Sequence, residues 1–464
     1  MDDRTFAELE RAIDQIWAIA QRLGLDPFPV HFEVVPAEVM YEIGAYGLPG
    51  RFSHWTHGRA YHHQKTLYDY GLTKIYELVI NSNPAYAFLL DSNSLLQNKL
   101  VVAHVLAHVD FFKHNAYFEH TNRQMIDTVA VNAERIRRYE FQHGRLEVER
   151  FLDAVLSIQE HVDPHVRFRR QPTPPPKPRS APPAPYDDLL SLTDPPATSE
   201  PGPTKFPPEP EKDLLLFIAE HARHLADWQR DVILIVRQEM LYFIPQLQTK
   251  ILNEGWASYW HARILRELPL SDDEAVEFAR MHAAILAPTK HHLNPYYVGL
   301  KILEDIERRW DHPSEEERLV LGRQPGQGRA KLFEVRTLEN DVSLIRNYLT
   351  RDLVEEMGLY IYKVEGDQLK VVETDWEKVR DLIVRSMTNF GNPYIVVEDG
   401  DYRRNGELYL KHIYEGQELD IAYAERTLQY VYQLWGRPVH LETVLNEKPV
   451  LLSYDGEKNT RKNL

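Results

Sequence analysis

The chain has 464 residues, of which 43% are hydrophobic and 11% aromatic, so it can bury more than one core. Its formal net charge of −16 argues against nucleic acid or an anionic membrane surface as the main partner. It contains no cysteine, which excludes disulfides, thiolate metal ligands and cysteine nucleophiles.

The first 170 residues predict helices around one short hairpin. Residues 5–24 form an amphipathic pattern with charges of both signs, unlike a signal peptide, and no apolar run approaches the roughly 18 residues of a membrane span. We therefore expect a cytoplasmic protein without a membrane span. Two apolar runs within 72–90 flank the turn Asn81–Pro84 and predict a β-hairpin. A helix to about Lys113 follows, capped by Asp91 or Ser92, and 121–142 and 145–162 predict two more helices.

Residues 171–210 hold half of the chain's 30 prolines, which cannot build a helix or a sheet ladder. This stretch is predicted to be a proline-rich linker or an insertion. The mostly helical segments on either side, 1–170 and 211–330, are expected to form one domain. Further helices are predicted at 212–240, 246–268, 273–287 and 295–309.

The last third changes character and predicts a separate C-terminal α+β domain, 331–464. Residues 331–336 read as a strand, and Asn340 or Asp341 begins a helix to about Glu356. From residue 369 the order is β-α-β-β-α-β plus a strand, which is close to a ferredoxin-like unit. The Asn405-Gly406 turn, the helix start at Asp420 and a helix end at Gly436 support this pattern.

Two segments carry residues with metal-ligand spacing. In AHVLAHVDFFKHN, His104 and His108 lie four residues apart, on one face of a helix. In NEGWASYWH, Glu254 and His261 lie seven residues apart, also on one face. Two imidazoles and a carboxylate are the protein ligands of one kind of zinc site. We therefore predict a metal site of His104, His108 and Glu254, with His261 as a fourth ligand or a group behind the ligands.

Zn²⁺ is the first choice for this nitrogen and oxygen ligand set, and Fe²⁺ or Mn²⁺ are alternatives. Zincin proteases carry a glutamate directly after the first histidine to activate water, but this chain has Val105 there. Either another group acts as the base, with Glu254, His261, His57 and Asp110 as candidates, or the protein does not hydrolyse peptides. His57 belongs to YGLPGRFSHWTHGRAY (46–61), where three glycines and a proline indicate a functional loop or a packed surface turn.

Seven blocks in matching order resemble the stage V sporulation protein R (SpoVR) family. They are 46–61, 103–115, 121–140, 251–265, 293–310, 333–362 and 414–443. The resemblance implies a role in sporulation, in formation of the spore cortex peptidoglycan. Relatives outside spore formers accompany a serine protein kinase and a von Willebrand A-like protein in stress responses, which makes these two proteins candidate partners.

The chemistry is left open by this resemblance. NEGWASYW is also similar to the helix that supplies the glutamate ligand in gluzincin-type metallopeptidases, and the hairpin ahead of the His104 helix is similar to the zincin order. One hypothesis is therefore a metal-binding regulatory or scaffold protein built on a zincin-like domain. The other is a metal-dependent hydrolase or transferase that acts on a peptide-like or peptidoglycan-precursor bond.

Overall fold

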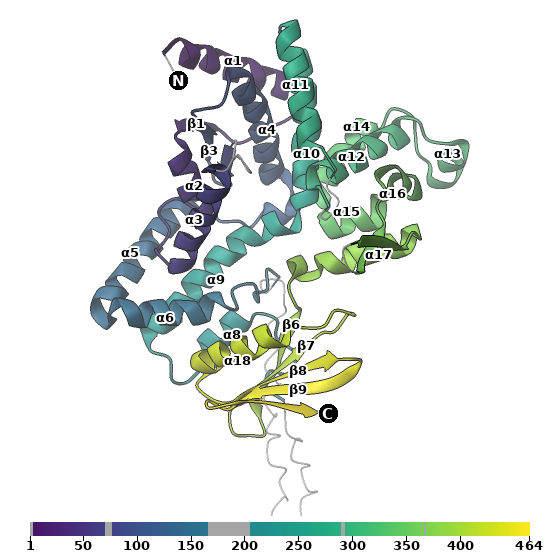
Figure 1. Cartoon of the computed structure of the whole chain (residues 1–464). Helices are drawn as coiled ribbons and strands as arrows, with labels where there is room; N and C mark the ends of the chain where they lie inside the picture. Colours follow the sequence, from purple (N-terminus) through teal and green to yellow (C-terminus); the bar gives the residue numbers. More distant parts are fainter. Residues whose placement is uncertain (1–2, 70–76, 166–204, 289–292, 366–367) are drawn as a thin grey trace, which may run out of the picture. The chain divides into compact units, whose positions relative to one another are not determined.

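The computed structural model describes residues 3–69, 77–165, 205–288, 293–365 and 368–464. Most of the predicted proline-rich segment lies outside these residues. The chain forms two compact units (Figure 1): unit 1 is Met1–Arg150 with Leu241–Asn392, and unit 2 is Phe151–Met240 with Pro393–Leu464. Among the described residues, no helix is long and apolar enough to cross a membrane.

Unit 1 is a helical body with a small sheet. Its elements are α1 (Asp3–Arg22), β1 (Val30–Val35), α2 (Ala37–Tyr46), α3 (Trp55–Asp69), β2 (Glu77–Ile80), β3 (Ala85–Leu90), α4 (Leu95–His114), η1 (Ala116–Phe118), α5 (Met125–His143), the start of α6 (Arg145–Leu156), the end of α9 (Asp227–Gln248), α10 (Lys250–Glu267), α11 (Asp272–Ile285), α12 (Pro295–Asp311), α13 (Glu315–Leu321), α14 (Gly328–Leu338), α15 (Asp341–Tyr348), α16 (Arg351–Met357), β4 (Ile361–Glu365), β5 (Gln368–Glu373), α17 (Trp376–Met387) and η3 (Thr388–Gly391).

The predicted hairpin is present as β2 and β3, which pair antiparallel. The sequence did not reveal β1, which pairs with β3 in parallel and gives the sheet the order β1-β3-β2. The core lies around α4 and α10, which pack against each other and bury Val105, Leu106, Trp256 and Trp260. Burial of such large apolar side chains is the main force that holds these helices together.

Unit 2 contains a five-stranded sheet with the order β10-β9-β8-β7-β6. Its elements are the rest of α6, α8 (Leu214–His221), most of α9, β6 (Ile395–Tyr402), β7 (Glu407–His412), α18 (Ile421–Trp435), β8 (Val439–Leu445), β9 (Lys448–Tyr454) and β10 (Asn459–Asn463). β7 and β8 are parallel and are joined through α18, while the other pairs are antiparallel. Asp420 caps α18 and Gly436 ends it in a left-handed conformation, as the sequence predicted.

The protein is thus α+β, mostly helical with a C-terminal sheet, but several details differ from the prediction, among them the helix expected at 212–240, which is the two helices α8 and α9. Residues 331–336 belong to α14 instead of a strand, because Leu332 and Val335 lie one helical turn apart and both enter the core of unit 1. The helix predicted from Asn340 to Glu356 is two helices, α15 and α16.

The elements after residue 369 follow the predicted order, as β5, α17, β6, β7, α18, β8 and β9, but they do not build one ferredoxin-like sheet. Within the described residues, β5 pairs with β4 only, and β6 is an edge strand of the five-stranded sheet. The reason lies in α17, whose Val379 and Val384 join the core around α4 and α10. The compact units therefore divide near residue 392, whereas the expected domain boundary was 331.

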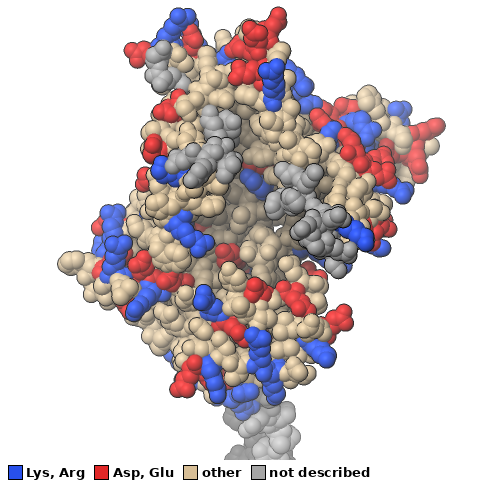
Figure 2. All heavy atoms as spheres, in the orientation of Figure 1, with Lys and Arg blue, Asp and Glu red and all other residues tan. Residues whose placement is uncertain are grey.

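On the face drawn in Figure 2, acidic and basic side chains of the described residues are interspersed. Partly exposed ion pairs of unit 1 include Lys99 with Glu274 and Lys301 with Glu356. Exposed pairs of this kind contribute little to stability, so the fold depends on the apolar core beneath them.

Candidate metal centre

Helix α4 carries the two histidines through the middle of unit 1. Ser94 caps it in a capping box with Gln97, so the cap lies two to three residues after the predicted Asp91 or Ser92. Because α4 is apolar on nearly every side, it is buried rather than amphipathic. His104 and His108 are therefore held with only 3% and 6% of their surface exposed.

Helix α10 carries Glu254, and its start is fixed by a residue far along the chain. Thr249 makes no side-chain cap, and the carboxylate of Asp341 instead accepts hydrogen bonds from the backbone N–H groups of Ile251 (2.8 Å) and Leu252 (2.9 Å). These are two of the donors that a helix start leaves without an intrahelical partner. Burial raises the pKa of Asp341 to about 7, against the lowering effect of these backbone hydrogen bonds.

A glycine pair sets how closely α10 approaches α12. A Cβ atom placed on Gly255 would lie 2.4 Å from the carbonyl carbon of Gly299, and one placed on Gly299 would lie 2.2 Å from the carbonyl oxygen of Ile251. Neither distance is compatible with a side chain, so both helices need glycine where they cross. This crossing fixes the backbone directly beside Glu254.

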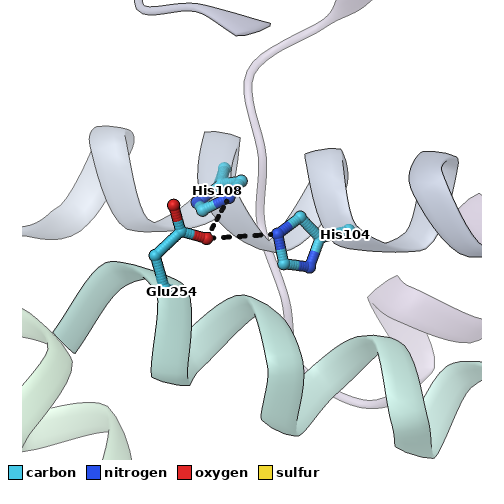
Figure 3. A group of neighbouring side chains, drawn as sticks. All are labelled: His104, His108 and Glu254. Atoms are coloured by element: carbon cyan, nitrogen blue, oxygen red, sulfur yellow. Dashed lines mark hydrogen bonds and ion pairs between the residues drawn. The ribbon is translucent and has the colours of Figure 1, made fainter. Parts of the chain in front are cut away.

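The three predicted ligands converge from the two helices (Figure 3). The Oε2 atom of Glu254 lies 3.3 Å from Nε2 of His104 and 3.4 Å from Nε2 of His108. One ligand atom from each residue can be chosen so that all three lie within 4.8 Å of one another. Such a group can surround a single cation after small side-chain adjustments, since ligand distances are roughly 2 Å.

The hydrogen bond of His108 determines which of its nitrogens can bind a cation. Its Nδ1 lies 2.8 Å from Oδ1 of Asn253, an amide oxygen that only accepts, so Nδ1 carries the proton. The lone pair of a neutral His108 is then on Nε2, which faces Oε2 of Glu254. Two buried acceptors that face each other repel unless a cation or a proton lies between them. The donor set therefore fits a divalent cation.

His104 is held by a chain of histidines on its other side. Its Nδ1 lies 2.9 Å from Nδ1 of His261, whose Nε2 lies 2.9 Å from Nδ1 of His282 on α11. If His104 presents its Nε2 lone pair to a cation, its Nδ1–H donates to His261, and the Nε2–H of His261 donates to His282. Histidine ligands are usually oriented by such a hydrogen bond on the remote nitrogen.

His261 was predicted as a fourth ligand or a group behind the ligands. In the structure it lies behind His104 and is hydrogen-bonded to that residue. It contacts the edge of His104 opposite to Glu254, so it does not join His104, His108 and Glu254 around a common point. Phasing within α10 placed it on the correct face, but only the tertiary structure shows which edge of His104 it meets.

The charge states of the group suit a cation. Burial lowers the pKa of His104 to about 4, so its imidazole is neutral at pH 7. Burial alone would raise the pKa of Glu254, but the charge of His108, the hydrogen bonds of His104 and His108 and the charge of Lys250 outweigh it and hold the pKa well below its usual range. A cation bound between His108 and Glu254 would take the place of the proton that gives His108 this charge. Neutral imidazoles and an ionised carboxylate are the forms that bind metals.

Lys250 is a charged neighbour of Glu254 on the same helix. Its ammonium group lies 2.5 Å from Oε1 of Glu254, one helical turn away, and 59% of its side chain is exposed. The outer oxygen of Glu254 therefore reaches toward solvent, while the inner oxygen faces the histidines. The i, i+4 spacing of Lys250 and Glu254 was the signal that could have revealed this pair.

Other candidates have different surroundings. Asp110, a candidate base, is paired with Arg336, at 2.8 Å, and accepts a hydrogen bond from Trp256 at 3.1 Å. It lies six residues after His104, which places it on another face of α4.

His57, a candidate catalytic base, is packed within its own segment. Its ring lies 5.0 Å from that of Tyr46 and 5.9 Å from that of Phe52. Burial lowers its pKa to about 3, with smaller effects from the charges of Arg51 and His54. These contacts give His57 a role in packing the 46–61 segment.

Tyr296, in the first turn of α12, is a further neighbour of the site. Asn294 caps α12 by accepting from the backbone N–H groups of Tyr296 and Tyr297, with Pro295 in the first turn, as this sequence pattern indicates. The Tyr296 ring also stacks on His104, with the ring centres 6.0 Å apart. The start of α12 thus borders the metal ligands.

Taken together, the site is a pair of histidines and a glutamate on two packed helices of a mostly helical α+β protein. Residues 3–392 match the family described as SpoVR like protein, and 393–446 match the SpoVR-like C-terminal domain. The chain therefore belongs to the SpoVR family, which supports an association with sporulation. The border between the two matches coincides with the border between the compact units at 392 and 393.

A relative from Escherichia coli (strain K12), named "Uncharacterized protein YcgB", is 29% identical to this chain. The similarity covers 95% of this chain and 92% of the relative. No solved structure matches the chain.

Proposed function

We propose that this SpoVR-family protein binds a divalent cation at His104, His108 and Glu254 and acts in sporulation as a cytoplasmic regulatory or scaffold protein. Formation of the spore cortex peptidoglycan is the proposed process. A serine protein kinase and a von Willebrand A-like protein are the proposed partners, as the family resemblance implies. Zn²⁺ is the proposed ion, with Fe²⁺ and Mn²⁺ as alternatives for the same donors.

One observation carries the metal proposal: Asn253 holds a proton on Nδ1 of His108, so the Nε2 atom of the neutral imidazole presents its lone pair to Glu254. A buried arrangement of this kind is unfavourable without a positive charge between the acceptors. His104 adds a second neutral nitrogen to the same oxygen. Together the three residues would hold the ion and leave a further coordination position for water or another ligand.

Metal analysis of the purified protein tests this proposal. The wild type should carry close to one equivalent of a divalent metal after dialysis, and the His104→Ala/His108→Ala double variant should carry none. The exposed His312 on the same unit provides the control, since His312→Ala should leave the metal content unchanged. Equal metal content in the wild type and the double variant would reject the site.

A metal-dependent hydrolase or transferase of gluzincin-like architecture is the second candidate. The observation that favours it is the ligand set itself, two histidines from one helix and a glutamate from the next helix of the core, with Lys250 connecting Glu254 to solvent. In that case Lys250 would hold an anionic group of a peptide-like or peptidoglycan-precursor substrate.

The regulatory role is preferred because the position of the usual base holds Val105, which is fully buried in the apolar core. General-base catalysis contributes roughly 10²–10⁴ in rate, so an enzyme without such a group needs a substitute. Turnover of a peptidoglycan-precursor peptide by the metal-loaded protein, lost in a folded Glu254→Gln variant, would favour the enzyme. Cortex formation that depends on His108 without any turnover would favour the regulatory role.

A further inference from the structure

Strand β1 is an edge strand whose outer side has no partner strand among the described residues. It pairs with β3 over all six residues, from Val30 with Ala85 to Val35 with Leu90 (Figure 1). Natural edge strands are usually protected by lysine, proline, a bulge or a covering element. β1 has no lysine, proline or glycine within it, and Pro29 and Pro36 lie just outside its ends.

The backbone of β1 offers a regular set of hydrogen-bonding groups on that outer side. The carbonyl oxygens of Pro29 and Val35 accept from the N–H groups of Ala85 (2.8 Å) and Asp91 (3.0 Å), so the odd-numbered residues point toward β3. Because direction alternates along a strand, the N–H and C=O groups of Val30, Phe32 and Val34 point outward. Three consecutive alternate residues are enough to pair with a short added strand.

A cavity of about 420 Å³ runs between β1 and α1 in unit 1. Its α1 wall includes Phe6, Leu9 and Ile13, and its floor includes Tyr86 and Leu89 of β3. Phe6 is 47% exposed although it is aromatic, and Leu9 is buried at the base of the groove. An apolar side chain from an added strand would cover this exposed surface.

The charges of the groove indicate what kind of strand it suits. Glu10 on α1 and Glu33 on β1 are both exposed, and no lysine or arginine is among the described residues that line the cavity. A partner with basic residues at matching positions would complement these carboxylates, whereas an acidic partner would be repelled.

We propose that the β1 edge and the adjoining α1 groove bind an extended segment of a partner protein, which adds to the sheet as a strand. The segment alternates apolar residues, which face α1 and fill the groove beside Phe6 and Ile13, with lysine or arginine, which point to the opposite face and pair with Glu33; a further basic residue at one end of the segment, on the α1 side, pairs with Glu10. The backbone of Val30, Phe32 and Val34 provides the hydrogen bonds, and the groove and its charges provide the selectivity. This site is independent of the candidate metal centre, whose ligands lie on α4 and α10.

Fluorescence anisotropy with two synthetic peptides tests the proposal on the full chain. One short peptide alternates valine with lysine and the other alternates valine with glutamate. The lysine peptide should bind, and the glutamate peptide should bind at least about tenfold more weakly, because two ion pairs are replaced by repulsion. In the Glu10→Lys/Glu33→Lys variant this preference should reverse.

Two further variants separate backbone pairing from surface charge. Val34→Pro removes an outward N–H group without removing a hydrogen bond to β3, so it should abolish peptide binding while thermal unfolding stays cooperative. Phe6→Ala should weaken binding, and Phe141→Ala, which truncates a phenylalanine that is 92% exposed on α5, is its matched control. His104→Ala/His108→Ala should leave peptide binding unchanged, which distinguishes this test from that of the metal site.

Three results would overturn the proposal: equal binding of the two peptides, binding that survives Val34→Pro and Phe6→Ala, or no binding of either peptide. Sedimentation of the wild type provides a further check. A concentration-dependent dimer that Val34→Pro dissolves would show that a second copy of this chain occupies the edge instead of a different partner.

Discussion

Replacing Gly255 by alanine is expected to destabilise unit 1 and to weaken the candidate metal centre, whereas the same change at Gly58 is expected to be mildly stabilising. Both glycines lie within helices, Gly255 in α10 and Gly58 in α3. Alanine is favoured over glycine inside a helix by roughly 0.5–1 kcal/mol, so propensity alone predicts a gain at both positions. The two sites differ in what the added methyl group would meet.

At Gly58 a Cβ atom would have no described neighbour within 4 Å, apart from its chain neighbours and its own helix backbone. At Gly255 it would lie 2.4, 2.5 and 2.9 Å from three backbone atoms of Gly299. Backbone of a packed helix cannot rotate away as a side chain can, so α10 and α12 must separate. Overpacking of a core costs about 1–3 kcal/mol, and the contact with backbone places this case at the upper end. After subtraction of the helix gain, Gly255→Ala should lose about 2 kcal/mol.

Urea unfolding followed by circular dichroism measures this difference, because both variants change only one methyl group. Metal affinity provides a second readout, since movement of α10 away from α12 also moves Glu254 with respect to His104 and His108 on α4. Gly58→Ala should retain the wild-type metal affinity. Equal stability of Gly255→Ala and Gly58→Ala would refute the close crossing of α10 and α12 and, with it, the explanation for this glycine.

Three other predictions concern histidines and Val105. Burial lowers the pKa of His57 from 6.5 to about 3, so its neutral form contributes stability that is complete above pH 6.5 and lost as the pH falls toward 3. His57 should account for about 2 kcal/mol of the stability lost from pH 7.5 to 5, so the loss in urea titrations should be smaller by that amount in His57→Asn and unchanged in the control His62→Asn. His282→Ala should lower metal affinity by about 10–100-fold, because it removes the hydrogen-bonded chain that supports His104. In the same calorimetric titration His312→Ala should have no effect, and equal affinities of the two variants would contradict the histidine chain. Val105→Glu, which restores the protease signature, should lower the free energy of unfolding by about 3 kcal/mol or more, because Val105 is fully buried. A stable variant that cleaves peptides would count against this reasoning.

Helical periodicity was sufficient to identify the candidate ligands, but it could not show which of them face a common point. Spacings of four and seven residues place His104 with His108 and Glu254 with His261, and these spacings hold in α4 and α10. The distinction between Glu254, which meets both imidazoles, and His261, which meets the far edge of one, depends on how the two helices cross. The position of α10 depends in turn on its close approach to Gly299 in α12, a residue with no recognisable signal in the sequence.

In the C-terminal third, most of the local elements were predicted correctly but their assignment to sheets was not. Local signals such as the Asp420 cap and the Gly436 helix end were predicted correctly, because they depend on neighbours within the same helix. The assignment of strands to sheets was wrong, since β5 and α17 have as strong a local pattern as β6 and β7. Only the packing of α17 decides the matter: it contacts α15 and α16, and its Val379 and Val384 join the core of unit 1.

The tripeptide Asn253-Glu254-Gly255 shows how one short segment can meet several requirements at once. Successive residues of a helix point about 100° apart, so each of the three faces a different neighbour. Asn253 accepts from His108 and fixes its tautomer, Glu254 meets both imidazoles, and Gly255 allows α12 to approach. A substitution at any one of them would therefore disturb the same centre through a different cause: a wrong tautomer, a missing ligand or a displaced helix. These causes can be separated by measuring metal affinity and unfolding free energy on Asn253→Leu, Glu254→Gln and Gly255→Ala. Only Gly255→Ala should lower the stability of the metal-free protein through a steric clash.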